Sequence, residues 1–219
     1  MASRRLPLFP LQTVVLFPGG LAPLHVFEPR YRQLTADALD GDRVIGMVAV
    51  PPEWANDLGG DPPVYGVGCE GFITDHQKLA DGRYHVVLRG THRFRIEREL
   101  PPDGARLYRV AEMEPLEEEL GGRDPRNPAL RQAVVERLRQ LARRNGEAAT
   151  ELPLERLARL DDVTFANSIC QALGLPTADK QGLLEAEDIP TRLVRLEGLL
   201  AFHLAALESP DPGGSRTVH

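Results

Sequence analysis

The 219-residue sequence has only two lysines, Lys78 and Lys180, one tryptophan and few aromatic residues, which make up 5% of the chain. A phosphate-binding loop of the G-x-x-x-x-G-K-[ST] type needs a lysine directly after its last glycine, and neither lysine stands there. The formal net charge is −6, with both signs spread over the two halves. Nucleic acid is therefore an unlikely main partner, because duplex affinity rests on Lys and Arg neutralising phosphates.

Cysteine is scarce as well: Cys69 and Cys170 are the only two and lie far apart. This spacing excludes a CxxC metal or redox motif and a small disulfide framework. We expect two buried, reduced thiols and a cytoplasmic protein. The opening MASRRLPLFPLQTVVLF starts like a signal peptide, but prolines interrupt it and no A-x-A site follows. No apolar run approaches the roughly 18 residues that span a bilayer, so we expect no membrane association.

Three glycines, Gly66, Gly68 and Gly71, have the G-x-G-x-x-G spacing of a dinucleotide-binding turn. That turn requires a strand before the first glycine and a helix after the last. Here a Pro- and Gly-rich segment precedes the motif, and strand-like residues follow it. We interpret the glycines as structural, in a strand that another segment approaches closely, and expect no cofactor.

Residues for catalysis or metal binding are also missing from the sequence pattern. The histidines show no H-E-x-x-H or other paired spacing, and His85 and His92, which flank a predicted hairpin, have no carboxylate at a matching offset. Ser168 has no His or Lys one helical turn away to activate it. We therefore predict no catalytic residue, no metal site and no enzymatic activity.

The first part of the chain, residues 1–118, reads as a β-rich unit, and its spacing favours a barrel or sandwich over a βαβ repeat. The expected strands are 13–17, 21–27, 43–50, 64–75, 83–90, 92–100 and 105–115. Turns are expected at Asp81-Gly82, at Gly90 and at residues 101–104. One helix is expected from Pro29 to about Leu39.

The second part, residues 119–208, reads as a bundle of four one-sided helices. Their expected ranges are 127–145, 162–174, 178–186 and 190–207, with Asn127 and Asp162 as caps for the first two. The remaining segment, 209–219, has no apolar anchors and is expected to be disordered. The fold class is thus α+β, a β-barrel with one early helix followed by a C-terminal helical bundle.

Arginines gather in the segment 83–98, where Arg89, Arg93 and Arg95 form a candidate basic stripe. Strand periodicity places Arg93 and Arg95 on one face and Phe94 on the other. The stripe is either a contact surface for RNA or acidic peptides, or a solvated strand face with cross-strand pairs, which we favour.

Trp54 lies in PPEWANDLGGDPP, whose composition predicts a long surface loop over residues 51–63. A large aromatic side chain there is either packed onto the barrel as a clamp or left partly exposed for a partner.

Several segments resemble the N-terminal domain of Lon proteases: LPLFPLQTVVLFPGGLAPLHVFEPRYRQL (6–34), PVYGVGCEGFI (63–73) and VVLRGTHRFRI (86–96). The helical part, with its K-Q-x-L-L-E segment and long final helix, is similar to that domain's bundle, so the resemblance covers about residues 5–207. It implies a PUA-like pseudobarrel and a role in recognising polypeptide substrates. Lon proteases continue into an ATPase and a Ser-Lys peptidase module, whose motifs have no counterpart here, so we expect a stand-alone form.

The leading hypothesis is a non-catalytic module that binds exposed apolar segments of polypeptides or a protein partner, as an adaptor or holdase. Its candidate binding residues are Phe17, Pro18, Phe27, Trp54 and Tyr65. The alternative is an RNA-binding protein, because PUA-like barrels in other families bind RNA. The acidic net charge and the lack of aromatic residues near the arginine stripe count against it.

Overall fold

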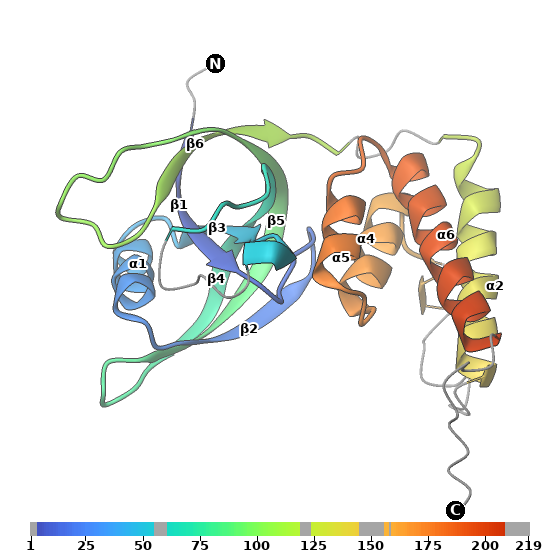
Figure 1. Ribbon diagram of the computed structural model, residues 1–219, viewed down its shortest axis with the longest axis horizontal. Coiled ribbons are helices and arrows are strands. Elements are labelled where there is room, and N and C mark those ends of the chain that lie inside the picture. Colours follow the sequence, from blue (N-terminus) through green and yellow to red (C-terminus); the bar gives the residue numbers. More distant parts are fainter. Residues whose placement is uncertain (1–3, 55–60, 119–123, 145–155, 158, 209–219) are drawn as a thin grey trace, which may run out of the picture.

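The computed structural model describes residues 4–54, 61–118, 124–144, 156–157 and 159–208. Six strands form a curved mixed sheet, and five α-helices accompany it in these residues. Figure 1 shows the sheet and one helix on one side of the molecule and the other four helices grouped on the other side. The α+β class expected from the sequence is confirmed.

The strands are β1 (Arg4–Leu11), β2 (Leu21–Val26), β3 (Val44–Ala49), β4 (Val67–Lys78), β5 (Tyr84–Glu99) and β6 (Val110–Leu116). Their order is β2-β5-β4-β3-β1-β6, and β5 also pairs with β6, which closes the sheet into a barrel. The first half of β5 pairs with β2 and the second half with β6. Consequently β2 lies outside the closed ring, on one edge of the sheet.

The first strand differs from the expectation. We expected a strand at 13–17, whereas β1 covers Arg4–Leu11 and residues 14–17 are an irregular connection. The apolar run is buried on two sides: Val15 and Phe17 join the core on the side of the helices, and Leu16 joins the barrel interior. The run is apolar because both of its sides are buried, and it does not pair with any described strand. The prolines of β1 are tolerated because the strand changes partner between them, from β6 to β3.

The turn expected at Gly90 was also wrong, because Gly90 lies inside the single long strand β5. A Cβ atom at Gly90 would come within 2.1 Å of the Phe17 carbonyl oxygen, so only glycine allows the 14–17 connection to cross here. Gly68 on β4 is equally confined, since its Cβ would meet the Met47 carbonyl at 2.4 Å. Gly68 and Gly71 of the motif thus lie in a strand at close approaches, as interpreted from the sequence, whereas Gly66 lies just before β4 with open space around it.

The helices are α1 (Pro29–Asp40), α2 (Asn127–Arg144), α4 (Asp162–Ala172), α5 (Thr177–Leu184) and α6 (Ile189–Glu208), with a short 3₁₀ turn η1 (Pro52–Trp54). Their positions match the expected ranges closely. The cap of α4 is one residue earlier than expected: Asp161 accepts a hydrogen bond from the Thr164 amide at 2.9 Å. The segment 209–219, expected to be disordered, lies outside the described residues. No helix in the described ranges is long and apolar enough to cross a membrane.

One hydrophobic core joins the barrel to the bundle. Phe17, Ala49 and Val67 of the barrel side pack in the same cluster as Phe165 of α4 and Leu193 of α6. Two further clusters fill the barrel and its contact with α1. The boundary predicted at residues 118 and 119 therefore separates two kinds of secondary structure but not two separate cores.

Candidate functional site

Catalytic and metal-binding arrangements are not found in the described residues. No group of three His, Cys, Asp or Glu side chains there could hold a metal ion. Both cysteines are buried and unpaired with each other, and burial raises the pKa of both thiols. A buried thiol with a raised pKa is a poor nucleophile.

A cavity of about 710 Å³ opens where the barrel meets the bundle, but its lining is charged. Arg93 and Glu118 lie at its base, and Arg131 of α2 and Asp162 of α4 form an ion pair at 2.6 Å in its wall. Apolar residues, among them Val163 and Ile189, also line it, so the cavity combines charged and apolar walls.

The charges at the base of this cavity form a buried network across the junction. Glu118 lies 2.8 Å from the Arg93 Nε of β5 and 2.6 Å from an Arg192 nitrogen of α6. Asn167 of α4 donates to the other Glu118 oxygen at 3.0 Å and accepts from Arg192. The network thus connects Arg93 on β5, Glu118 just after β6, and the helices α4 and α6.

Arg93 also binds the end of α5, since one of its terminal nitrogens donates to the carbonyls of Leu184 and Ala186 at 2.8 and 2.7 Å. Burial, and then the nearby Arg192 guanidinium, lowers the pKa of Arg93 to about 10, so the side chain stays charged at neutral pH. Arg93 is only 3% exposed, whereas Arg89 and Arg95 are exposed. The expected basic stripe is therefore interrupted, because the bundle covers its middle residue.

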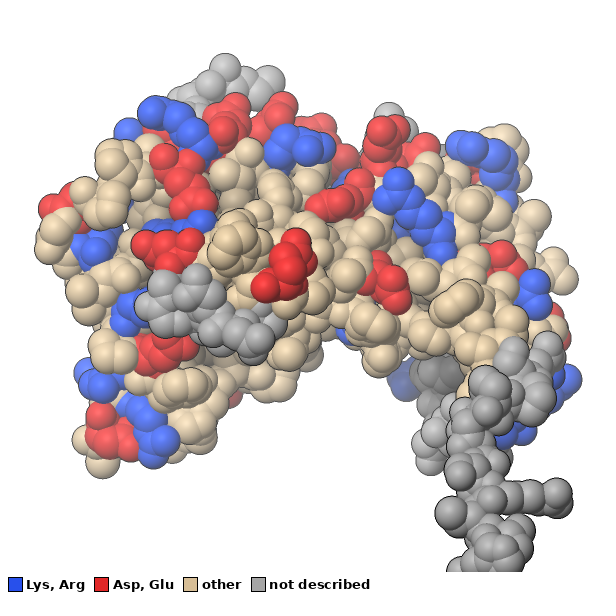
Figure 2. Space-filling view, in the orientation of Figure 1, with Lys and Arg blue, Asp and Glu red and all other residues tan. Residues whose placement is uncertain are grey.

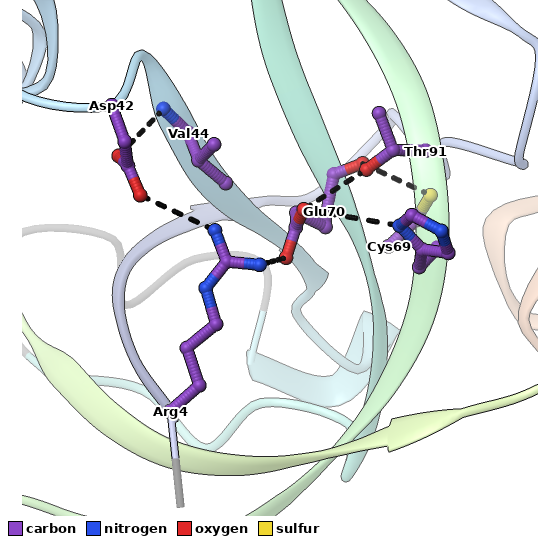
Figure 3. A network of polar contacts seen from close by, with 7 residues as sticks. Arg4, Asp42, Val44, Cys69, Glu70 and Thr91 are labelled. Carbon is purple, nitrogen blue, oxygen red and sulfur yellow. Dashed lines mark hydrogen bonds and ion pairs between the residues drawn. The ribbon is translucent and has the colours of Figure 1, made fainter.

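A second polar network holds the strands of the barrel together (Figure 3). Buried Glu70 of β4 accepts from Arg4 at 2.9 Å and from the Thr91 hydroxyl at 3.1 Å. Arg4 also reaches Asp42 at 3.2 Å, which accepts from the Val44 amide. These contacts join β1, β4 and β5 with the start of β3.

Two of the five candidate binding residues do not form an exposed site. Phe17 is 0% exposed, and its amide donates to the Gln171 Oε1 of α4 at 2.9 Å. Pro18 beside it is half-buried. Phe17 therefore stabilises the junction between barrel and bundle, and its expected role as an exposed binding residue was wrong.

Trp54 and Tyr65 lie on the barrel side of the junction, near α5. Trp54 is 43% exposed on η1, the short cyan helix in front of the sheet in Figure 1. Tyr65 is half-buried against the core of the bundle. Burial, and then the carboxylates of Glu53 on η1 and Glu185 after α5, raise the pKa of Tyr65. In Figure 2 uncharged side chains cover most of the lower part of this junction.

Phe27 lies on a different part of the barrel. It follows β2 and is 60% exposed, and its ring centroid is 6.0 Å from that of His25. At the other end of β2, Leu21 is 57% exposed, a residue that the sequence analysis did not single out. Its alternation with Ala22 in LAPLHV was the available signal, since one face of that strand had to point outward.

The described residues thus form a closed barrel that shares a core with a helical bundle and leaves isolated large apolar side chains exposed. The sequence profile of the ATP-dependent protease La (LON) substrate-binding domain matches residues 5–201. The chain belongs to this family.

Two bacterial Lon proteases are similar to this chain over most of its length. The Lon protease of Xanthomonas oryzae pv. oryzae is 30% identical over 197 residues, which are 89% of this chain and 22% of that protein. The Lon protease of Trichlorobacter lovleyi is 31% identical over 206 residues, or 90% of this chain and 24% of that protein. The chain thus spans about a quarter of the length of these relatives.

Solved structures match the fold along nearly its whole length. A Lon N-terminal domain protein from Xanthomonas campestris has a TM-score of 0.63 and 30% identity, covering 91% of this chain and 98% of that one. The N-terminal domain of a Mycobacterium avium complex Lon protease has a TM-score of 0.69 at 21% identity, covering 91% and 100%. The second match concerns the fold alone.

Proposed function

We propose that this chain binds exposed apolar segments of polypeptides, as an adaptor or holdase, and does so without chemistry of its own. Membership of a substrate-binding family over residues 5–201 is the observation that carries the proposal. The exposure of Trp54, a large aromatic side chain on a short turn, supports it, because such residues dominate the energy of many interfaces. The cytoplasm is the compartment we propose for it.

The binding surface that we propose for this function consists of Trp54 and Tyr65, beside the end of α5. An apolar side chain of a polypeptide would contact the Trp54 ring, and Tyr65 offers a hydroxyl at the edge of the same surface. The carboxylates of Glu53 and Glu185 near that hydroxyl disfavour acidic segments at this point.

RNA binding receives less support. That alternative rested on the arginine stripe, but Arg93 of this stripe is buried and binds Glu118 and the end of α5. Of the three stripe residues only the separated Arg89 and Arg95 remain exposed on β5, and a protein that follows a phosphate backbone needs a continuous basic groove.

The test is binding of a permanently unfolded protein, such as reduced and carboxymethylated lactalbumin, to wild-type chain and to Trp54→Ala. Loss of an aromatic anchor commonly costs about 2 kcal/mol or more, roughly thirtyfold in affinity. Trp54→Phe is the matched control and should retain most of the affinity. The single tryptophan also reports contact directly, through a blue shift of its fluorescence when the polypeptide binds.

Salt separates the two functions. Apolar capture holds or strengthens when salt rises, whereas RNA binding falls steeply. Affinity for unfolded protein that is equal in wild type and Trp54→Ala would contradict the proposed surface. Binding to single-stranded RNA in preference to unfolded protein would contradict the proposed function.

A further inference from the structure

The outer edge of β2 carries unpaired backbone groups. β2 pairs with β5 alone and is the terminal strand of the sheet order. In Figure 1 it runs along the lower border of the barrel, between α1 and the bundle. Strands with a free edge are templates for pairing with another extended chain.

The direction of these backbone groups follows from one hydrogen bond. The Gly90 amide donates to the Gly20 carbonyl at 2.9 Å, and Gly20 stands opposite Gly90 just before β2 begins. Hydrogen-bonded pairs alternate along an antiparallel ladder. The backbone groups of the even-numbered residues of β2 therefore point to β5, and those of Leu21, Pro23 and His25 point away from it.

Those three residues make no backbone hydrogen bond on the outer side to any other residue in the described ranges. The free edge thus offers two amides, from Leu21 and His25, and three carbonyls. Pro23 has no amide to offer, and its position on the outer side is where a strand tolerates proline. The alternate spacing of donors and acceptors matches that of an extended polypeptide.

Side chains beside this edge provide contacts for apolar residues. Leu21 and Phe27 are exposed at its two ends, and between them lies a hollow of about 380 Å³. Pro23 and His25 of β2 and His85 and Val87 of β5 contribute to its lining, and the hollow continues over β4, where residues 75–77, including the Asp75 carboxylate, complete it. The His25 and His85 rings stand directly opposite each other across the two strands, with centroids 4.9 Å apart.

The charges beside this edge also favour a particular composition of the bound segment. Neither β2 nor the part of β5 that pairs with it contains a carboxylate, and exposed Arg89, opposite Leu21, makes no ion pair with any described residue. Asp75 of β4 lines the far side of the hollow, so an acidic residue is favoured only at the Leu21 end, beside Arg89.

We infer that β2 binds an extended polypeptide segment by strand addition, with apolar side chains at alternate positions directed toward the hollow between Leu21 and Phe27 and an acidic residue beside Arg89. The inference rests on the proposed function and adds the conformation and composition of the segment that is bound. Main-chain hydrogen bonds supply affinity that does not depend on the full sequence of the segment, and the hollow supplies preference for alternate apolar residues.

The direct test uses a short dye-labelled peptide in which threonine alternates with valine and phenylalanine, with glutamate at both ends. Its binding to the full chain is measured by fluorescence anisotropy. Two versions carry N-methyl groups, one on the amides of the apolar residues and one on those of the threonines. An added strand uses alternate amides only, so we expect one version to bind about tenfold more weakly and the other within about twofold of the parent.

A protein variant tests the same contact from the other side. His25→Pro removes an outward amide, and His25→Ala removes the side chain but keeps that amide. We expect His25→Pro to bind the peptide several-fold more weakly than His25→Ala, with both variants melting near the wild type. If His25→Pro fails to fold, the two N-methylated peptides decide the question alone. Lysine at both peptide ends in place of glutamate should weaken binding at low salt.

The inference is overturned if both N-methylated peptides bind alike, or if a folded His25→Pro binds like His25→Ala. Unfolded lactalbumin that still binds in a Trp54-dependent manner would then leave the proposed function standing. Failure of both probes to bind wild-type chain would overturn the inference and the proposed function together.

Discussion

The guanidinium of Arg93 and the carboxylate of Glu118 form a buried ion pair, with Nε and Oε1 2.8 Å apart, at the point where the barrel meets the helical bundle. Glu118 also binds Arg192 of α6, so a single carboxylate faces two guanidinium groups. Both arginines also donate hydrogen bonds to backbone carbonyls at the end of α5. This arrangement fixes the bundle on the barrel by direction-dependent contacts, beside the apolar core that the two parts share.

Removing one partner of this network should destabilise the protein strongly. Glu118→Gln leaves two buried guanidinium groups without a counter-charge, and breaking a buried pair in this way costs about 3–5 kcal/mol. Urea unfolding followed by circular dichroism measures the change. Arg95→Ala, an exposed arginine on the same strand as Arg93, is the control and should change stability by less than about 0.5 kcal/mol. Equal effects of the two substitutions would show that the network adds no stability.

The glycine motif provides a matched pair of substitutions. Gly68→Ala forces a Cβ to within 2.4 Å of the Met47 carbonyl, whereas Gly66→Ala meets nothing within 4 Å. Overpacking of this kind costs about 1–3 kcal/mol or more, while the alanine at position 66 should be neutral within about 0.5 kcal/mol. Thermal melts of the two variants test this. A larger loss from Gly66→Ala than from Gly68→Ala would contradict this prediction.

Barrel and bundle should unfold together. Their shared core includes Phe17 on the barrel side and Phe165 on α4, so neither part buries its apolar surface alone. Differential scanning calorimetry of the whole chain should give one transition. A fragment covering residues 120–208 should melt less cooperatively than the whole chain, because a small helical piece has a marginal core. Two widely separated transitions in the whole chain would contradict this prediction.

Stability should fall as the pH rises above about 9. Burial raises the pKa of the Cys170 thiol from 9.0 to about 12. Between these values the unfolded chain releases the thiol proton while the folded chain keeps it, so the free energy of unfolding decreases with pH. Urea titrations from pH 8 to 10 measure the slope, and Cys170→Ala should reduce it. Arg93, with its pKa near 10, acts in the opposite direction only above that pH. A flat profile up to pH 10 would show that neither buried thiol, Cys69 or Cys170, keeps a raised pKa in the folded chain.

The order and kind of most elements could be predicted from the sequence, since they depend on local patterns. The four helices after residue 126 follow their apolar periodicity and caps, and strand alternation correctly placed Phe94 inside the barrel. The same alternation placed Arg93 on the outer face of the strand, which agrees with its contacts to α5. What alternation could not predict is that the bundle covers that face, because one strand's periodicity distinguishes two faces but not what packs on them.

The candidate site shows the same division. The sequence marked Trp54 and Phe27 as aromatic residues in turn-rich segments, and both are exposed. It marked Phe17 for the same reason, and Phe17 is core. The sequence by itself determined the class of secondary structure along the chain and the lack of recognisable catalytic motifs. Only the tertiary structure decided which apolar side chains remain exposed and which strand edge stays unpaired, because burial and pairing depend on contacts between segments far apart in the chain.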